Sequence, residues 1–308
     1  MIASTESVSV PVPIVCPKCN GDFAHTTTGA QCQKCESDYP FAHQHLDLIV
    51  GERYADSTPD EVLVAEEASN ADTTIRFWIP LLHELWPESK TAPAILSLGC
   101  GVGTDVDELC AAGFNAMGVD CGKRSSIWPT RQFPERLVMA NVGNLPFADA
   151  SFDFIISGCF FPHVGVDGAS YDVVPDYYAL RLKLAREITR VLKPGGRVIT
   201  CNPNRWFPFD IFHGHTANHA SMRPSSPFNP LLPSRGDYGK LFGAAGCRNI
   251  RALPVEGYWA FTGSSKSLKG RMLSAPIRFL FWLVSRKPLR FLRGSCVNPW
   301  LIVMIEKA

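Results

Sequence analysis

The sequence predicts an α/β fold with a buried, mostly parallel sheet, preceded by a small cysteine-rich module. Two observations predict the sheet. A short apolar run at 94–98, AILSL, leads into a glycine-rich loop and then a helical pattern, and a second apolar run at 115–120, NAMGVD, ends in an acid. The third observation, two C-x-x-C pairs within residues 16–35, predicts the module.

The bulk composition sets the scale of the protein. The 308 residues are 46% hydrophobic, which suffices for one sizeable core and a small appended module. A formal net charge of +1 excludes a general attraction of the whole molecule to polyanions. The first residues contain neither a basic region nor a long apolar stretch, so we expect no signal peptide and a cytoplasmic protein. In that compartment paired cysteines usually bind metal or act in catalysis.

The module occupies residues 12–50. Its two C-x-x-C pairs would place four thiolates around one tetrahedral ion, and a site closed by four sulfur ligands is structural rather than catalytic. A pair of redox dithiols is the alternative. The following stretch at 37–49, SDYPFAHQHLDLI, resembles the end of the short zinc ribbons that activate methyltransferases, and its two histidines are expected to be loop residues. The predicted zinc ligands are Cys16, Cys19, Cys32 and Cys35.

A helical connector is predicted over residues 51–92, with Pro80 interrupting the pattern ADTTIRFWIPLLHELW. The main domain then runs over residues 93–308. After its first strand and glycine loop, the segment TDVDELCAAGF predicts a helix capped by Thr104 or Asp105 and ended by a glycine. A loop between a strand and a helix start lets glycine backbone approach a ligand closely.

The glycine loop reads G-x-G-x-G, at positions 99, 101 and 103. A dinucleotide site would need a third glycine where Thr104 stands, and no phosphate-binding lysine motif accompanies the loop. Asp120 lies about twenty residues beyond the first glycine, the usual place for an acceptor of ribose hydroxyls.

Two further segments carry a family resemblance. They read LVMANVGNLPFADASFDFIISG at 137–158 and EITRVLKPGGRVIT at 187–200. With the glycine loop, their order and spacing over residues 95–202 resemble the class I S-adenosylmethionine-dependent methyltransferases, in particular the subtype that includes the ubiquinone and menaquinone ring methylases. The resemblance implies a Rossmann-like, mostly parallel seven-stranded sheet and S-adenosylmethionine as cofactor, but names no substrate. It implies these cofactor contacts: Gly99, Cys100, Gly101, Gly103, Asp120, Asn141, Val142 and Ser157.

Asn141 stands where the family usually has an aspartate near the adenine amine. Methyl transfer is an in-line displacement, so alignment matters most and a base is optional. His163 follows the fourth strand, where it can accept a proton from a hydroxyl or an enol, or simply be a loop histidine.

Residues 203–235 form an unusual insertion at the edge of the sheet where ligands of α/β proteins bind. We expect a lid over the acceptor, the alternatives being an arm packed on the protein surface or a dimer contact. Asn204, Arg205 and His213 are candidate acceptor contacts, and a catalytic metal at the nearby histidines is not expected.

Residues 264–295 contain eight Lys or Arg and no acid, with Phe and Trp between them. Pro276 and Pro288 are expected to divide the segment into short helices, with the arginines on one side. Such a segment suits an anionic membrane surface, here the inner face of a membrane. The alternatives are packing on the sheet and RNA binding, and the acidic balance of the front module makes nucleic acid the less favoured partner.

The sequence thus predicts a methyltransferase that modifies oxygen or carbon of a small or lipid-like acceptor. One rival is a ribosomal RNA methyltransferase that uses its ribbon to bind RNA. The other is a non-catalytic scaffold, which the complete glycine loop and Asp120 argue against.

Overall fold

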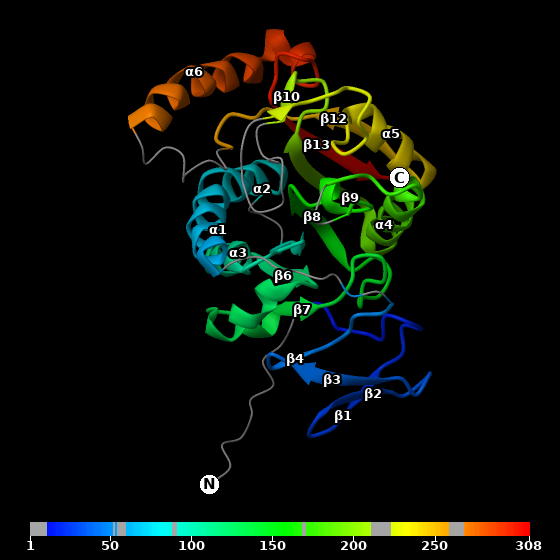
Figure 1. The fold of residues 1–308 in the computed structure, drawn as a ribbon. Coiled ribbons are helices and arrows are strands. Elements are labelled where there is room, and N and C mark those ends of the chain that lie inside the picture. The colour runs from blue at the N-terminus through cyan, green and yellow to red at the C-terminus, as the bar shows by residue number, and fades with distance from the viewer. Residues whose placement is uncertain are drawn as a thin grey trace.

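The computed structural model describes residues 11–51, 53, 60–87, 91–167, 171–210, 223–258 and 268–308. Its centre is a seven-stranded sheet in the order β12-β13-β9-β8-β5-β6-β7, in which only β13 runs antiparallel to its neighbours (Figure 1). The predicted mostly parallel seven-stranded sheet is confirmed. The strands are β5 (Ala94–Leu98), β6 (Asn115–Asp120), β7 (Leu137–Met139), β8 (Phe152–Gly158), β9 (Leu192–Pro203), β12 (Cys247–Ala252) and β13 (Trp300–Lys307).

The sheet is buried on both faces, as the uninterrupted apolar runs predict. One face packs on α4 (Tyr177–Val191) and α5 (Arg235–Ala244), and α3 (Thr104–Ala111) packs on the other. The connector, which lies on the same side as α3, contains α1 (Asp60–Thr73), the π-helical turn η1 (Thr74–Trp78) and α2 (Ile79–Leu85) (Figure 1).

Two helix details differ from expectation. Pro80 lies within α2 and does not interrupt the helical path, because the wider turn η1 precedes it and the Ile79 N–H bonds to the Thr74 carbonyl. The N-cap of α3 is Gly103, with a φ of 81° and no side-chain cap, so neither Thr104 nor Asp105 fills that role. The Asp105 carboxylate instead accepts from Ser97 and from the Val106 N–H.

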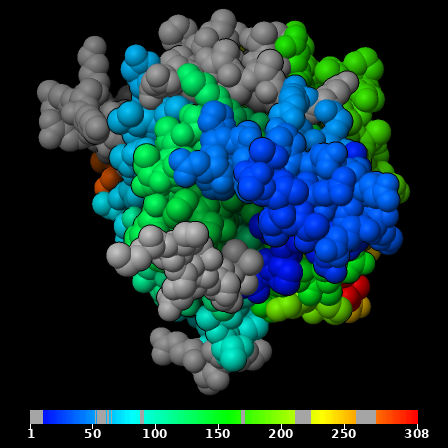
Figure 2. Space-filling model, turned by 90° about the horizontal axis from the view of Figure 1, so that it is seen from below, coloured from blue at the N-terminus to red at the C-terminus, as the bar shows by residue number. Residues whose placement is uncertain are grey.

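The front module is a small antiparallel sheet of four strands, and it lies beside β7 (Figure 1). The strands are β1 (Phe23–His25), β2 (Gly29–Cys32), β3 (Asp38–Ala42) and β4 (His45–Leu46). Gly29 is required by close approach rather than by a turn, because a Cβ there would lie 2.2 Å from the Tyr39 carbonyl oxygen. Seen from below, the module covers one side of the main domain (Figure 2).

The segment before β13 holds α6 (Leu268–Ser285) and the 3₁₀-helix η6 (Lys287–Leu292). The expectation that Pro276 divides the segment is wrong, since α6 continues through it. Phe281 and Val284 of this helix pack in the same core cluster as Trp300, and this burial offsets the hydrogen bond that proline removes. None of the helices among the described residues has the length and apolar content of a membrane span.

Short elements complete the architecture and place the loops around the sheet's carboxyl edge. The chain returns through a two-stranded ribbon formed by β10 and β11, which pair antiparallel. The remaining elements are η2 (Lys123–Thr130), η3 (Pro134–Arg136), η4 (Phe161–His163), β10 (Phe209–Asp210) and β11 (Arg223–Pro224).

Candidate functional site

The glycine loop joins β5 to α3 in the conformation that glycine permits. Gly99, Gly101 and Gly103 have φ of 71°, 55° and 81°, a region that other residues avoid. The Gly99 N–H bonds to the Val119 carbonyl, which draws the loop over the end of β6. A Cβ on Gly99 would lie 2.6 Å from the Phe160 ring, so the start of the loop and the segment after β8 are in contact.

Asp120 ends β6 beside this loop, and backbone amides orient its carboxylate. One oxygen accepts from the Gly101 N–H at 2.9 Å, and the other accepts from the N–H groups of Cys121 and Gly122 at 2.7 and 3.0 Å. Three donors therefore fix the carboxylate at the carboxyl edge of the sheet, where its remaining lone pairs suit vicinal hydroxyls.

Asn141 and Val142 follow β7 at the same edge of the sheet, and both are half-buried. The Asn141 Oδ1 accepts from the Val50 N–H at 2.9 Å, a contact that the sequence did not indicate. The carbonyl oxygen of an amide has two lone pairs, so it can accept from a second donor.

The end of β8 supplies two unusual residues next to the loop. The Ser157 hydroxyl is buried and has no hydrogen-bond partner in the described part of the chain. Cys159 is buried with a φ of 56°, a strained conformation for a residue with a side chain. Burial, together with the charges of Cys201 and Asp210, raises the pKa of the Cys159 thiol. Orphaned hydroxyls and strained backbone at a sheet edge are typical of ligand sites.

Three groups around the loop were not predicted. Trp128, fully buried, donates from Nε1 to the Gly101 carbonyl at 2.8 Å. Arg124 pairs with Glu66 of α1 above the same glycine. Burial raises the pKa of Asp105 to about 6, although the Ser97 hydroxyl and the Val106 N–H lower it. No local pattern in the sequence marks these contacts, because each joins segments that are distant in the chain or depends on burial.

Cys100 is buried at the turn of the loop, and burial raises the pKa of its thiol well above the usual range. This thiol is therefore a small apolar side chain under the loop rather than a nucleophile.

His163 ends η4 and is half-buried. Its ring lies 5.9 Å from that of Tyr171, centroid to centroid. The loop that carries both residues is closed by a hydrogen bond between the Asp167 N–H and the Asp172 carbonyl. His163 therefore stands at the end of the short helix η4, in the segment that follows β8.

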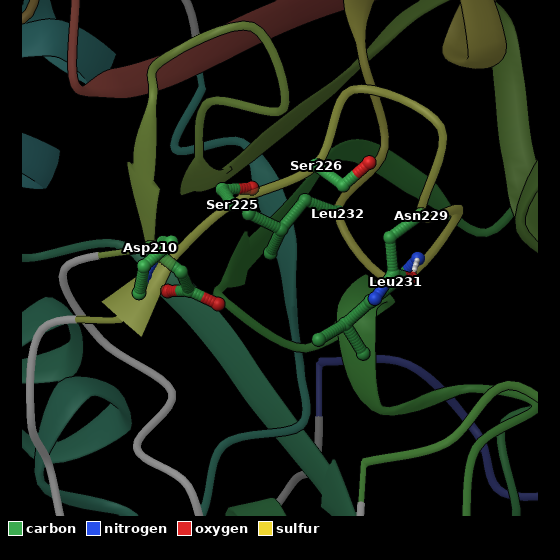
Figure 3. A pocket seen from close by; sticks show the side chains of 7 residues that line it. Asp210, Ser225, Ser226, Asn229, Leu231 and Leu232 are labelled. Carbon is green, nitrogen blue, oxygen red and sulfur yellow. Dashed lines mark hydrogen bonds between the residues drawn. The ribbon is translucent and has the colours of Figure 1, made fainter.

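A cavity of about 230 Å³ opens between β10, β11 and the loop that follows them (Figure 3). The Asp210 carboxylate, 1% exposed, lies on one side of it, and Leu231 and Leu232 lie beside the polar side chains. The polar part of the lining is completed by Ser225, Ser226 and Asn229.

Arg181 of α4 holds this cavity to the loop after β8. Its buried guanidinium donates to the carbonyls of Val164 and Pro230 at 2.9 and 2.7 Å, and to that of Leu231 at 3.0 Å. One side chain thus fixes both His163's loop and the wall of the cavity. Burial lowers the pKa of Arg181, but four carbonyl acceptors satisfy its charge.

Two of the expected acceptor contacts are engaged inside the protein. Asn204 is fully buried and donates to the carbonyls of Ser295 and Asn298. Arg205 pairs with Asp237 at 2.8 Å. These bonds join the end of β9 to the segment before β13 and to α5. His213, like residues 211–222 of the expected lid, lies outside the described residues.

The four cysteines of the front module meet at one point. Their sulfur atoms all lie within 4.8 Å of one another, and the closest pairs are 3.4 and 3.6 Å apart. A tetrahedron of sulfurs about 2.3 Å from a central ion has edges of about 3.8 Å, so the cluster fits one ion. The N–H groups of Lys34 and Cys35 point to the Cys32 sulfur at 3.4 and 3.5 Å. The structure therefore contains a four-thiol cluster able to hold a metal.

The thiols of this cluster compete for protons. Desolvation and the neighbouring Cys32 thiol raise the pKa of Cys19 to about 12, whereas hydrogen bonding with Ser37 lowers the pKa of Cys35 to about 6. A dication resolves this competition, because a coordinating thiol is deprotonated outright.

The arginines after α6 do not lie on one helical side, contrary to expectation. Arg286 stands beyond the helix, pairs with Glu256 and covers the Trp282 ring. Arg293 donates to the carbonyls of Val284 and Ser285, which end α6. Helix α6 exposes Phe279 and Trp282, with 62% and 43% of their surfaces in solvent, and their rings stack at 5.7 Å.

The chain is similar to known proteins over part of its length. Residues 96–200 match the family model described as a methyltransferase domain. The chain is 25% identical over 164 residues to an uncharacterised 37.1 kDa protein in transposon TN4556 of Streptomyces fradiae, which covers 51% of this chain and 43% of that protein. It is 30% identical over 118 residues to the biotin biosynthesis bifunctional protein BioHC of Cellvibrio japonicus, covering 38% and 21% of the two chains. The chain thus spans less than half the length of either curated relative.

Among solved structures, similarity extends to Haemonchus contortus phosphoethanolamine N-methyltransferase 2, in complex with phosphomonomethylethanolamine and S-adenosylhomocysteine. The identity is 17% and the TM-score 0.48, over 85% of this chain and 62% of that chain.

Proposed function

We propose, from the premise that residues 96–200 are a class I S-adenosylmethionine-dependent methyltransferase domain, that this chain methylates a small or lipid-like acceptor on oxygen or carbon. One observation carries the proposal. The glycine loop passes over the end of β6, and three amides orient the Asp120 carboxylate beside it. This pairing of an approachable backbone with a fixed acceptor suits the ribose of an adenosyl cofactor.

The cofactor contacts follow from the positions of the residues along the sheet edge. Asp120 would accept both ribose hydroxyls, and the backbone of the three glycines would lie against the ribose and the methionine part. Asn141 and Val142 would meet the adenine, and the unpartnered Ser157 hydroxyl would serve the methionine end. Cys100 would support the loop from beneath.

S-adenosylmethionine, when bound, supplies an electrophilic methyl group on a sulfonium, with S-adenosylhomocysteine as the leaving group. The protein's task is alignment, because the displacement requires nucleophile, carbon and sulfur in line. His163, half-buried on its loop, would take the proton that an acceptor hydroxyl or enol loses. Arg181 would maintain the geometry by holding that loop and the cavity wall together.

The cavity beside Asp210 would receive the acceptor. Its carboxylate, hydroxyl and amide groups can accept hydrogen bonds, and two leucines provide apolar surface. At about 230 Å³ it is smaller than most ligand pockets, so it would enclose one reactive group rather than a large substrate.

We propose that the basic segment at 264–295 contacts an anionic membrane surface. Phe279, Trp282 and Phe291 expose between 43% and 71% of their side chains, and the chain has no acid between Glu256 and Glu306. Exposed aromatics beside Lys and Arg suit the interface of such a membrane. The protein would then meet a lipid-like acceptor at the membrane surface that contains it.

The four cysteines would hold zinc, since four thiolates in a tetrahedral, closed arrangement are typical of a structural zinc site. Metal analysis of the purified protein should find about one zinc per chain. The absence of zinc from freshly purified, folded protein would contradict this assignment.

The deciding experiment is calorimetric titration of the zinc-loaded chain with S-adenosylhomocysteine. We expect micromolar binding, and Asp120→Ala should weaken it at least about tenfold because hydrogen bonds to a charged group are lost. Asp149→Ala is the matched control, since Asp149 is an exposed partner of Arg190 far along the chain from the loop. A folded wild-type protein that does not bind this ligand would overturn the proposed function.

A further inference from the structure

The chain that leaves the front module is built into the main sheet. Asp47 forms a parallel bridge with Met139 of β7, and the Leu48 N–H donates to the Met139 carbonyl at 2.9 Å. Ile14, at the other end of the module, bridges to Phe147. Figure 1 shows the module beside β7, and Figure 2 shows it against one side of the main domain. The module is therefore attached to the strand whose end carries the predicted adenine contacts.

The first contact with the cofactor site is direct. The Val50 N–H donates to the Asn141 Oδ1, so rotating the amide by half a turn would cost this hydrogen bond. The last residue of the module thus sets which end of Asn141 faces which partner.

The second contact passes through one tryptophan. The His45 ring packs edge-on against Trp128, with centroids 5.1 Å apart, and its Nε2 lies 2.9 Å from the Pro134 carbonyl oxygen. Trp128 in turn donates to the carbonyl of Gly101, the middle glycine of the loop. Trp128 is fully buried, so displacement of His45 would leave its neighbour in a cavity.

The four-thiol cluster is connected to the second contact. The Tyr39 hydroxyl lies 3.2 Å from the Cys16 sulfur, and Tyr39 belongs to β3. Strand β3 pairs with β4, where Ala42 faces His45. Because so small a sheet cannot bury enough apolar surface to be stable alone, the metal would maintain this route.

We propose that the metal-loaded module is a working part of the cofactor site, in which His45 and Val50 act as positioning residues for the glycine loop and Asn141. The inference rests on the proposed function, since it concerns affinity for the same cofactor. It assigns the module a role in cofactor binding in addition to any role in the protein's own stability.

The test compares S-adenosylhomocysteine affinities of full-length, zinc-loaded proteins. His45→Ala and Val50→Pro should each weaken binding about three- to tenfold while zinc content stays at the wild-type level. His25→Ala is the matched control, because His25 is an exposed histidine of the same module on β1. Wild-type affinity in both variants would overturn the inference and leave the proposed function standing. A wild-type protein that does not bind the ligand overturns the proposed function, and the inference with it.

A second measurement needs no variant. Coupling between two sites is reciprocal at equilibrium, so S-adenosylhomocysteine must lower the fraction of zinc that a chelator removes at equilibrium. We expect the apparent zinc affinity to rise by about the same factor as cofactor affinity falls when zinc is removed. An unchanged zinc affinity at saturating S-adenosylhomocysteine would overturn the inference even if a variant failed to fold.

Discussion

Two additions to the central sheet domain, the front module and the α6–η6 segment, are joined to it in opposite ways. The module makes backbone hydrogen bonds to β7, packs His45 against Trp128 and bonds the Val50 N–H to Asn141. Helix α6 packs Phe281 and Val284 on the core and leaves Phe279 and Trp282 in solvent. The module therefore directs these side chains toward the central domain, whereas α6 also presents side chains to solvent.

The difference has a physical source. Val12, Tyr39 and Leu48 of the module lie in the same apolar core cluster as the main sheet, and directional hydrogen bonds to Met139 and Asn141 accompany this apolar contact. Helix α6 is held by apolar burial, which has no directional requirement and leaves the opposite side free. Substitutions in the two additions should consequently have different effects: loss of zinc and of module structure in one case, and loss of overall stability in the other.

The largest effect is expected from removing one metal ligand. Cys32→Ala should abolish most zinc binding and unfold the module, because a structural zinc site contributes about 10 kcal/mol or more of apparent binding free energy. Metal analysis and hydrogen exchange over residues 22–46 measure both effects. Cys296→Ala is the matched control, since Cys296 is an exposed cysteine outside the cluster. Full zinc content in Cys32→Ala would show that the cluster is not the metal site.

The next largest effect is expected at Phe281, the side chain by which α6 packs on the core. Phe281 is 4% exposed, and Phe281→Ala should lower the free energy of unfolding by about 3–5 kcal/mol through the cavity it leaves. Phe279→Ala, on the exposed side of the same helix, should change it by less than about 0.5 kcal/mol. Urea unfolding of the zinc-loaded proteins distinguishes the two. Equal losses of unfolding free energy in the two variants would mean that α6 does not pack one particular side on the core.

The sheet could be predicted from the sequence because its signals are local. Strands buried on both faces read as short apolar runs, as AILSL at 94–98 and WLIVM at 300–304 do, and glycines mark the loop between β5 and α3. The four ligands of the cluster were equally visible from their spacing. These features depend on neighbours in the chain, and a periodicity or a motif reports such neighbours.

The contacts around the glycine loop could not be predicted in this way. His45 and Pro134 are 89 positions apart, and Val50 and Asn141 are 91 apart. Asp210 reaches its cavity only through the pairing of β10 with β11. Pro276 illustrates the opposite case. Proline is a strong local signal for the end of a helix, but the packing of α6 on the core overrides it and the helix continues.

A smaller effect on stability is expected from Asp105, which lies in the central domain and belongs to neither addition. The pKa of Asp105 in the folded protein is about 6, above its ordinary value of 3.8. The folded state therefore binds the proton more tightly, and the stability this provides is present at low pH and is lost as the pH rises through 6. Relative to Asp105→Asn, the wild type should lose about 1.4 kcal/mol between pH 5 and pH 8 in urea unfolding. Parallel pH profiles for the two proteins would contradict a raised pKa.

The smallest effect tests the outward side of α6. Trp282→Ala should weaken binding to vesicles that contain anionic phospholipid about fivefold, since roughly 1 kcal/mol of apolar contact is lost. Phe41→Ala is the matched control, because Phe41 is an exposed aromatic of the front module, at the other end of the molecule (Figure 1). Neither substitution should alter the affinity for S-adenosylhomocysteine. Vesicle sedimentation measures the first quantity and calorimetry the second. Zinc removal should leave vesicle binding unchanged, because only the front module depends on zinc. If zinc removal weakened vesicle binding as much as Trp282→Ala does, the front module would also contribute to membrane binding, and the contrast between the two additions would be wrong.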